Sequence, residues 1–318
     1  MKTFRNFSIK MKLSLGFGAM VLIALALGTA GWLGEGAVSE KAQMAGLIEE
    51  AGRNFQDCRR QEKNFELRGF AKYPGDTKNA EEKFAETTAE VTERLQKYGS
   101  SDLDKEEKEI FQKLQSGFKD YAAGFAKVVE ARKLRDASLG IWKKTGEDLI
   151  SASVAIKNNI VDPAVKSAQA SRNADEINRW ISISWSFNED FLQPFTLMRV
   201  RAAYFLGLKD ESLWEEFLKQ QDAVTAGLKD FGVMIEGYDT LASAVAKLNA
   251  PLKQYEAAGV QYHQAVVTER EVNAELVKFG RAAAAVFEKL LEDINADLTA
   301  FSKKVSMILA VLSVVGGK

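Results

Sequence analysis

The sequence RRQEKNFELRG, from Arg59 to Gly69, indicates how the chain is built, because a relaxed copy, RVRAAYFLGLK, returns at Arg199 to Lys209. One constant offset aligns Phe55 with Phe195, Cys58 with Met198, Arg59 with Arg199, Glu62 with Ala202 and Phe65 with Phe205. The chain is therefore a tandem duplication.

Positions 55, 58, 62 and 65 follow the spacing of one face of an amphipathic helix, so this face is expected to point into a helical core. Glu62 then falls among apolar neighbours. A buried carboxylate needs a partner, because a lone buried charge costs several kcal/mol. The nearest candidate cations are Arg59, Lys63 and Arg199.

The repeat continues beyond this motif with a slightly smaller offset. A second constant offset matches Phe84, Val91, Leu95, Tyr98 and Gly99 with Phe217, Val224, Leu228, Phe231 and Gly232. A nearly identical one matches Lys113, Leu114, Phe118, Tyr121 and Gly146 with Lys247, Leu248, Leu252, Tyr255 and Gly280. Both halves of the chain thus carry a short helix pair followed by a long helix.

The first copy resembles the R-x-x-E-K-x-F-x-x-R-G signature of helical bimodular sensor domains, which are ligand-binding regions of many methyl-accepting chemotaxis proteins. The resemblance covers most of residues 35–302 and implies a sensor for small organic acids. The second copy departs from the signature, since Ala202 and Ala203 replace the Glu-Lys pair. Charge chemistry there depends on Arg199 and Arg201 alone.

The composition predicts an all-α protein. The chain has 318 residues, 46% hydrophobic and 27% charged, with only four prolines and abundant Ala, Leu, Glu and Lys. A single cysteine excludes an intrachain disulfide and a multi-cysteine metal site. The sequence has no phosphate-binding loop, HExxH motif or nucleophile elbow, so we expect neither an enzyme nor a cofactor.

The amino terminus predicts a membrane anchor. Residues 1–12 are a basic cytoplasmic leader, and 13–34 form a predicted transmembrane helix that is uncharged throughout. A cleaved signal peptide is the alternative, although its apolar region is typically only about 7–15 residues long. Small residues at Ala26, Ala30 and Gly34 favour close approach of two such helices, and hence a homodimer.

Residues 303–318 are predicted to begin a second transmembrane helix. Lys303 and Lys304 precede an uncharged run from Val305 to Gly317 that is too short to span by itself. The intervening segment, 35–302, is then a single extracytoplasmic block. Inner-membrane localisation with a periplasmic or extracellular sensor follows.

The net charge of this block makes nucleic acid an unsuitable partner. Outside the leader and the carboxy-terminal segment, 36 basic residues remain against 44 acidic ones, a net charge of −8. An anionic ligand would need a local basic pocket to overcome this field.

Breakers and caps predict six helices: about 37–73, 77–98, from Asp102 or Asp104 to 162, from 174 to at least Phe205, 211–237 and 240–303. At about 1.5 Å per residue, the first two together match the third, and the fourth and fifth together approach the sixth. This predicts two stacked four-helix bundles sharing the third and sixth helices. The first and fourth helices would lie in the membrane-near bundle, and the second and fifth in the far one.

Two ligand sites follow from this arrangement. In the near bundle, a small carboxylate would bind among Arg59, Arg60, Lys63, Arg199, Arg201 and Tyr204, since guanidinium groups bind carboxylates bidentately. The alternative is surface charge plus a structural pair with Glu62. In the far bundle, Tyr121 and Tyr255 could line a second pocket or simply be core.

We therefore expect an extracytoplasmic sensor of a chemotaxis-type receptor that transmits ligand binding through its last long helix. The same sensor could serve a histidine kinase or a cyclic-dinucleotide enzyme. A different class of function, docking of a periplasmic protein around Trp180 and Trp185, is the further alternative.

Overall fold

The computed structural model describes residues 9–316, apart from some side chains near both ends, and all regular elements in this range are helical. They are α1 (Ile9–Arg68), α2 (Ala80–Gly99), α3 (Lys105–Ile156), η2 (Lys157–Val161), α4 (Asp162–Ser171), α5 (Ala174–Ser186), η3 (Phe187–Leu192), α6 (Gln193–Leu208), α7 (Glu211–Met234), α8 (Asp239–Ala246) and α9 (Asn249–Gly316). The predicted all-α class is confirmed.

The helices form two compact units. Unit 1 takes in the chain up to Phe125 and from Ala274 onward, and so contains α1, α2, the first part of α3 and the last part of α9. Unit 2 is Ala126–Asn273. The two long helices α3 and α9 each contribute to both units, as predicted.

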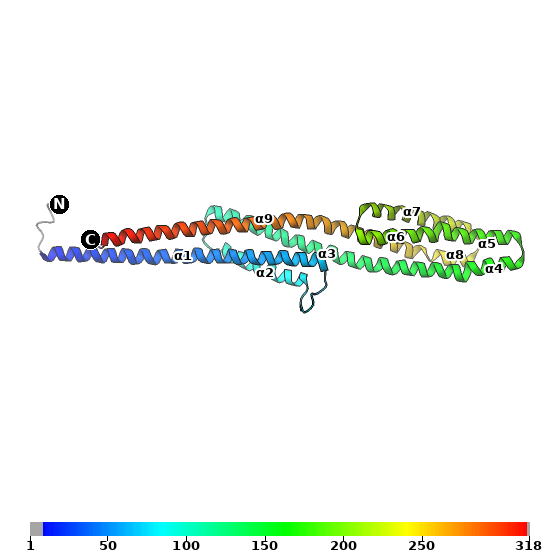
Figure 1. Cartoon of the computed structure of the whole chain (residues 1–318), viewed down its shortest axis with the longest axis horizontal. Helices are drawn as coiled ribbons and strands as arrows, with labels where there is room; N and C mark the ends of the chain where they lie inside the picture. Colours follow the sequence, from blue (N-terminus) through cyan, green and yellow to red (C-terminus); the bar gives the residue numbers. More distant parts are fainter. Residues whose placement is uncertain (1–8, 317–318) are drawn as a thin grey trace. The chain divides into compact units, whose positions relative to one another are not determined.

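The predicted membership of the bundles is wrong. In unit 1, α1 packs side by side with α2, and in unit 2, α6 packs against α7 (Figure 1). The helix lengths and breaks instead predicted the first and fourth helices in one bundle. The reason lies in the segment after α1, where Gly69 and Gly75 adopt positive φ angles of 59° and 89° and the chain turns back. The second helix therefore returns along the first.

Local signals set the ends of these helices. The Gly69 N–H donates to the Phe65 carbonyl at 2.7 Å, so α1 ends at Arg68, five residues before the predicted end. Asn79 caps α2 in a capping box with Glu82. Asp104, one of the two residues predicted to start the third helix, caps α3, and Asn173, after which the fourth helix was predicted to begin, caps α5.

The sequence predicts a kink or a break in the helix at Asp162-Pro163, but helical structure does not end there. Proline lacks an N–H and clashes with the carbonyl four residues earlier in an α-helix. Here the π-helical turn η2 ends two residues before Pro163, and η3 ends two residues before Pro194. The wider π turns accommodate the prolines, and helical structure continues through both sites.

Aromatic rings fill the core of unit 1. The Phe55 ring contacts the Tyr121 and Phe287 rings, with centroids 5.3 and 5.5 Å apart. Phe84 stacks on Phe125 at 3.8 Å. The stripe predicted on α1 is buried as expected.

The equivalent stripe on α6 is buried in unit 2, which confirms its predicted place in a core. Its members are Phe195, Met198, Ala202 and Phe205, each at most 4% exposed. Phe195 and Phe205 contact Tyr255 and Tyr262 edge to face. The duplication in sequence is therefore a duplication of the packed core.

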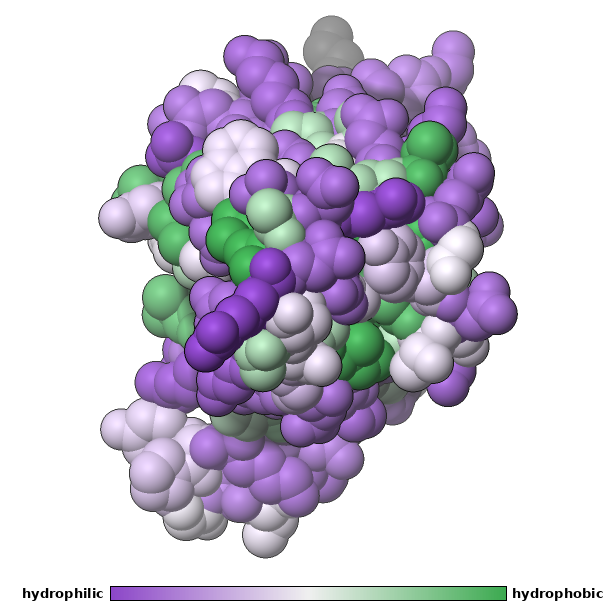
Figure 2. All heavy atoms as spheres, turned by 90° about the vertical axis from the view of Figure 1, so that its right-hand side faces the viewer, coloured by the Kyte–Doolittle hydropathy of each residue, from purple (hydrophilic) through white to green (hydrophobic). Residues whose placement is uncertain are grey.

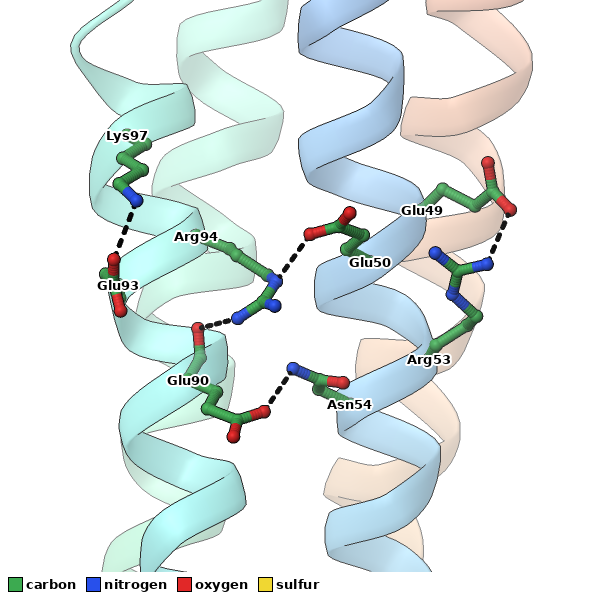
Figure 3. Close-up of polar contacts among 8 residues, drawn as sticks. All are labelled: Glu49, Glu50, Arg53, Asn54, Glu90, Glu93, Arg94 and Lys97. Atoms are coloured by element: carbon green, nitrogen blue, oxygen red, sulfur yellow. Dashed lines mark hydrogen bonds and ion pairs between the residues drawn. The ribbon is translucent and has the colours of Figure 1, made fainter.

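Polar side chains join α1 to α2 along their exposed edge (Figure 3). Arg94 Nε lies 2.9 Å from a Glu50 carboxylate oxygen, and the Asn54 amide donates to Glu90 at 2.8 Å. Exposed pairs of this kind contribute only about 0–1 kcal/mol each. The buried aromatic core, rather than this network, carries most of the stability of unit 1.

The face shown in Figure 2 is mainly hydrophilic, with hydrophobic residues in separate patches. Among the residues that the structure describes, no helix combines the length and apolar character needed to cross a membrane. Residues 1–8 and 317–318, and many side chains of the predicted membrane segment 13–34, lie outside the described part.

Candidate functional site

Two charged residues predicted to bind ligand on α1 lie on the surface. Arg60, whose side chain is 67% exposed, pairs with Asp57 at 3.1 Å. Lys63 pairs with Glu66 at 2.8 Å. These i, i+3 pairs are ordinary helix-surface contacts.

Two residues predicted on the fourth helix also lie outside the core. Arg201 pairs with Glu216 of α7 at 3.0 Å. Tyr204 is 54% exposed. The half-buried members of the motif, Arg59 and Arg199, remain as site candidates.

The structure places Arg59 in unit 1 and Arg199 in unit 2. The prediction that both belong to one bundle is therefore wrong. The tyrosines are redistributed in the same way, because Tyr121 belongs to unit 1 and Tyr255 to unit 2. Each unit thus combines one of the predicted arginines with one of the predicted tyrosines.

In unit 1, the tyrosine binds a buried carboxylate, and the arginine lies against the neighbouring helix α9. The Tyr121 hydroxyl of α3 donates to Glu62 of α1 at 2.6 Å, and Glu62 is only 5% exposed. The other carboxylate oxygen lies 3.5 Å from Lys63 Nζ. The Arg59 side chain passes Gly280 of α9, where a Cβ atom would lie 3.1 Å from Arg59 Nε.

The electrostatics of Tyr121 reflect how closely these groups meet. Burial raises the pKa of the Tyr121 phenol, the negative charge of Glu62 raises it further, and Arg59 opposes the rise. Tyr121 therefore stays protonated and remains a hydrogen-bond donor. The sequence predicted a cation as the main partner of Glu62, but the tyrosine is its closest partner.

Unit 2 repeats this arrangement without the carboxylate. Arg199 of α6 and Tyr255 of α9 both approach Gly146 of α3, where a Cβ atom would lie 3.4 Å from Arg199 Nε and 2.8 Å from Tyr255 Cε2. The position equivalent to Glu62 is Ala202, which is 4% exposed. Among the described residues, Arg199 has no ion pair or hydrogen bond.

Unit 2 has a further donor close to this tyrosine, and the equivalent position of unit 1 lacks it. The indole N–H of Trp142, one turn before Gly146 on α3, is buried and lacks a hydrogen-bond partner among the described residues. Its ring lies 5.8 Å from that of Tyr255, centroid to centroid. The offset that aligns Gly146 with Gly280 places Leu276 at the equivalent position of unit 1.

The same neighbouring groups, Arg199 and Trp142, act on the pKa of Tyr255. Burial raises this pKa, and the Arg199 charge and the Trp142 indole oppose the rise. The indole acts through its proximity to the phenol, since the two groups do not meet in hydrogen-bond geometry. The sequence named Arg199 and Tyr255 but missed Trp142. The signal available was the repeat itself, which pairs this tryptophan with a leucine.

A guanidinium, a phenol and an indole N–H, with no carboxylate among them, suit a small carboxylate ligand. A guanidinium binds such a group through charge-assisted hydrogen bonds, and a phenol and an indole N–H can each donate one more. No group of three or more metal-ligating side chains occurs among the described residues.

Sequence comparison matches residues 6–174, more than half of the chain, to a family described as a four helix bundle sensory module for signal transduction. This chain belongs to that family. The match confirms the predicted kinship with the sensor domains of methyl-accepting chemotaxis proteins, and it makes the protein a sensory module. A search of curated proteins gives no match.

One solved structure shares the fold of this sensory module. The sensor domain of the histidine kinase TorS from V. parahaemolyticus aligns with a TM-score of 0.54 at 12% identity, covering 80% of this chain and 99% of that one. The TorS sensor domain in complex with TorT in the presence of TMAO gives 0.43 at 12% identity, over 78% and 99%. The first likeness shows a shared fold and nothing about ligands.

Proposed function

We propose that this sensory module is the extracytoplasmic region of a transmembrane chemoreceptor and that it binds a small carboxylate in unit 2. The observation that carries the proposal is the comparison of the two units. In unit 1 the Tyr121 hydroxyl donates to Glu62, whereas unit 2 has Ala202 at the equivalent position and an additional buried donor, Trp142. A buried donor without a partner costs about 1–3 kcal/mol, which a bound carboxylate would recover.

The site favours a monocarboxylate of few atoms. It offers one guanidinium, from Arg199, and the rings of Trp142, Tyr255 and Phe217 that pack on one another there are buried. A single carboxylate group uses all three donors, while a second one would meet these aromatic rings without a cation.

Sequence features support attachment to the inner membrane. The leader carries four basic residues, and an uncharged stretch follows from Leu13 to Leu33. The positive-inside rule then places 35–302 in the periplasm or outside the cell. A homodimer would bring two copies of the small-residue ridge into contact.

The proposed signal leaves the sensor through α9. This helix runs without interruption from Asn249 to Gly316 and carries Tyr255 of the proposed site. A ligand that binds one position of this helix better than another shifts its population toward that position. A chemotaxis module, a histidine kinase or a cyclic-dinucleotide enzyme could receive the same displacement.

Replacing Arg199 by alanine tests the proposal. The full chain in detergent should melt at higher temperature with formate, acetate or propionate than with chloride at equal ionic strength. A ligand at a hundredfold its dissociation constant adds about 2.7 kcal/mol. Arg199→Ala should abolish this gain, whereas Arg201→Ala, which removes a surface guanidinium two residues away, should retain it. Equal stabilisation of both variants would reject the site.

Docking of a protein partner is the second candidate, and an exposed tryptophan favours it. Trp185 is 64% exposed beside Ile181, which is 47% exposed, whereas Trp180 packs against Tyr238 at 4.9 Å. If docking carries the signal, Trp185→Ala should lose signalling while retaining carboxylate-induced stabilisation. Under the carboxylate proposal, the Trp185→Ala variant should retain both signalling and carboxylate-induced stabilisation.

A further inference from the structure

Glu62 has a role that structural pairing alone does not explain. Its carboxylate is 5% exposed and contacts the hydroxyl of Tyr121, and Arg59 passes beside the same tyrosine. In unit 2, the equivalent arginine and tyrosine meet beside Gly146, and the position equivalent to Glu62 is Ala202, which has no carboxylate. Unit 1 therefore supplies a carboxylate of its own to its tyrosine, whereas the repeat position in unit 2 has none.

We propose that Glu62 is a built-in ligand: its carboxylate occupies unit 1 in the way that an external carboxylate occupies unit 2. This role for Glu62 rests on the function proposed for unit 2. It implies that this sensor has one responsive unit and one that is permanently occupied.

Tethering explains why an external anion would not displace Glu62. A group attached to the binding element acts at an effective concentration set by its short linker, in the millimolar range or above. A free monocarboxylate at lower concentration cannot compete with it. Unit 1 thus remains in its ligand-bound arrangement whether or not the external ligand is present.

Leu276 supports this asymmetry from the opposite helix. Leu276 occupies the position of unit 1 that is equivalent to Trp142 of unit 2. Its side chain is apolar and fully buried, so unit 1 has no indole N–H there. Unit 1 therefore has one donor fewer, which matches a carboxylate already held by its own chain. Unit 2 has one donor more, which matches a ligand that must be captured from solution.

Two exchanged substitutions test this role in the full chain. Glu62→Ala removes the atoms beyond Cβ, and acetate supplies the same number of carbon and oxygen atoms. This variant should melt at lower temperature than wild type in chloride, regain its stability in acetate, and bind two acetates per chain instead of one. In the converse variant, Ala202→Glu, the new carboxylate should close unit 2, so that no acetate binds.

Matched controls separate this effect from general destabilisation. Glu62→Gln keeps the side chain's volume and an acceptor for Tyr121, so it should bind only one acetate. Glu66→Ala removes an exposed carboxylate one turn away and should behave as wild type.

A Glu62→Ala protein that folds and binds no more acetate than wild type would overturn this role, as would an Ala202→Glu protein that binds acetate undiminished. The second result decides the matter if Glu62→Ala does not fold. A wild type that binds none, with one acetate gained in Glu62→Ala, would reject the function proposed for unit 2 while supporting the role of Glu62.

Discussion

A single hydroxyl group distinguishes Tyr98 from its repeat partner Phe231. Tyr98 is fully buried and its hydroxyl has no hydrogen-bond partner among the described residues. An unsatisfied buried polar group costs about 1–3 kcal/mol, so Tyr98→Phe should stabilise the protein by about 1 kcal/mol in melting curves. Tyr121→Phe is the matched control. It loses the bond to Glu62 and should destabilise by a similar amount or more.

The same variant should change the response to alkaline pH. Burial raises the pKa of Tyr98 above its ordinary value of about 10, and the nearby charge of Glu107 raises it further. The folded state therefore keeps the proton. The resulting stability is complete below about pH 10 and is lost as pH rises toward the folded-state pKa. Tyr98→Phe should lose less stability above pH 10 than wild type. An equal loss would show that Tyr98 does not contribute to it.

Gly146 leaves the space in which Arg199 and Tyr255 meet. A Cβ atom there would lie 2.8 Å from the Tyr255 ring, which is held in the core. Gly146→Ala should lower stability by about 1–3 kcal/mol and weaken acetate binding. Gly140→Ala lies in the same helix with open space around it and should instead gain up to about 1 kcal/mol. A Gly146→Ala protein as stable as Gly140→Ala would contradict the geometry of the site.

At the scale of elements, the π-helical turn η3 depends on a glycine of α7. Pro194 has no N–H to donate to the Asp190 carbonyl, and this carbonyl points at Gly227, where a Cβ atom would lie only 1.8 Å away. An added Cβ atom is fixed to the α7 backbone, and the atom it would meet is a backbone carbonyl oxygen. A side-chain movement therefore cannot relieve the clash.

Gly227→Ala should therefore be strongly destabilising, by about 3 kcal/mol in denaturant titrations. Gly232→Ala, on the same helix with nothing near it, should be neutral or stabilising by up to about 1 kcal/mol. If the two variants unfold at the same denaturant concentration, η3 does not pack on α7 as described.

The elements also show what the sequence could predict. Local signals such as the caps at Asp104 and Asn173, and the repeat at Arg59 and Arg199, predicted helices, cores and the duplication. They could not predict that the chain reverses after Gly69, because this depends on a turn conformation that the Pro74-Gly75 pair only suggests. The prediction that the two arginines share one bundle and the two tyrosines the other was therefore wrong, and the ligand-binding role of these residues stays a prediction.

At the scale of the whole molecule, the basic residues at the amino terminus predict on which side of the membrane the sensor lies. Four basic residues precede the uncharged stretch from Leu13, so residues 35–302 should lie outside the cytoplasm. A cysteine introduced at Gly75, in the exposed turn between α1 and α2, should react with a membrane-impermeant maleimide in intact spheroplasts. The native Cys58 is fully buried and serves as the unreactive control. Labelling only after lysis would contradict this orientation.

The two equivalent sites of the complete chain are proposed to differ in occupancy, one closed by Glu62 and one open beside Arg199. Calorimetric titration of the full chain with acetate, at constant ionic strength, counts the open sites. We predict one acetate per chain for wild type and for Arg59→Ala, and none for Arg199→Ala. Binding to Arg199→Ala with undiminished affinity, or two acetates bound by wild type, would contradict this difference between the units.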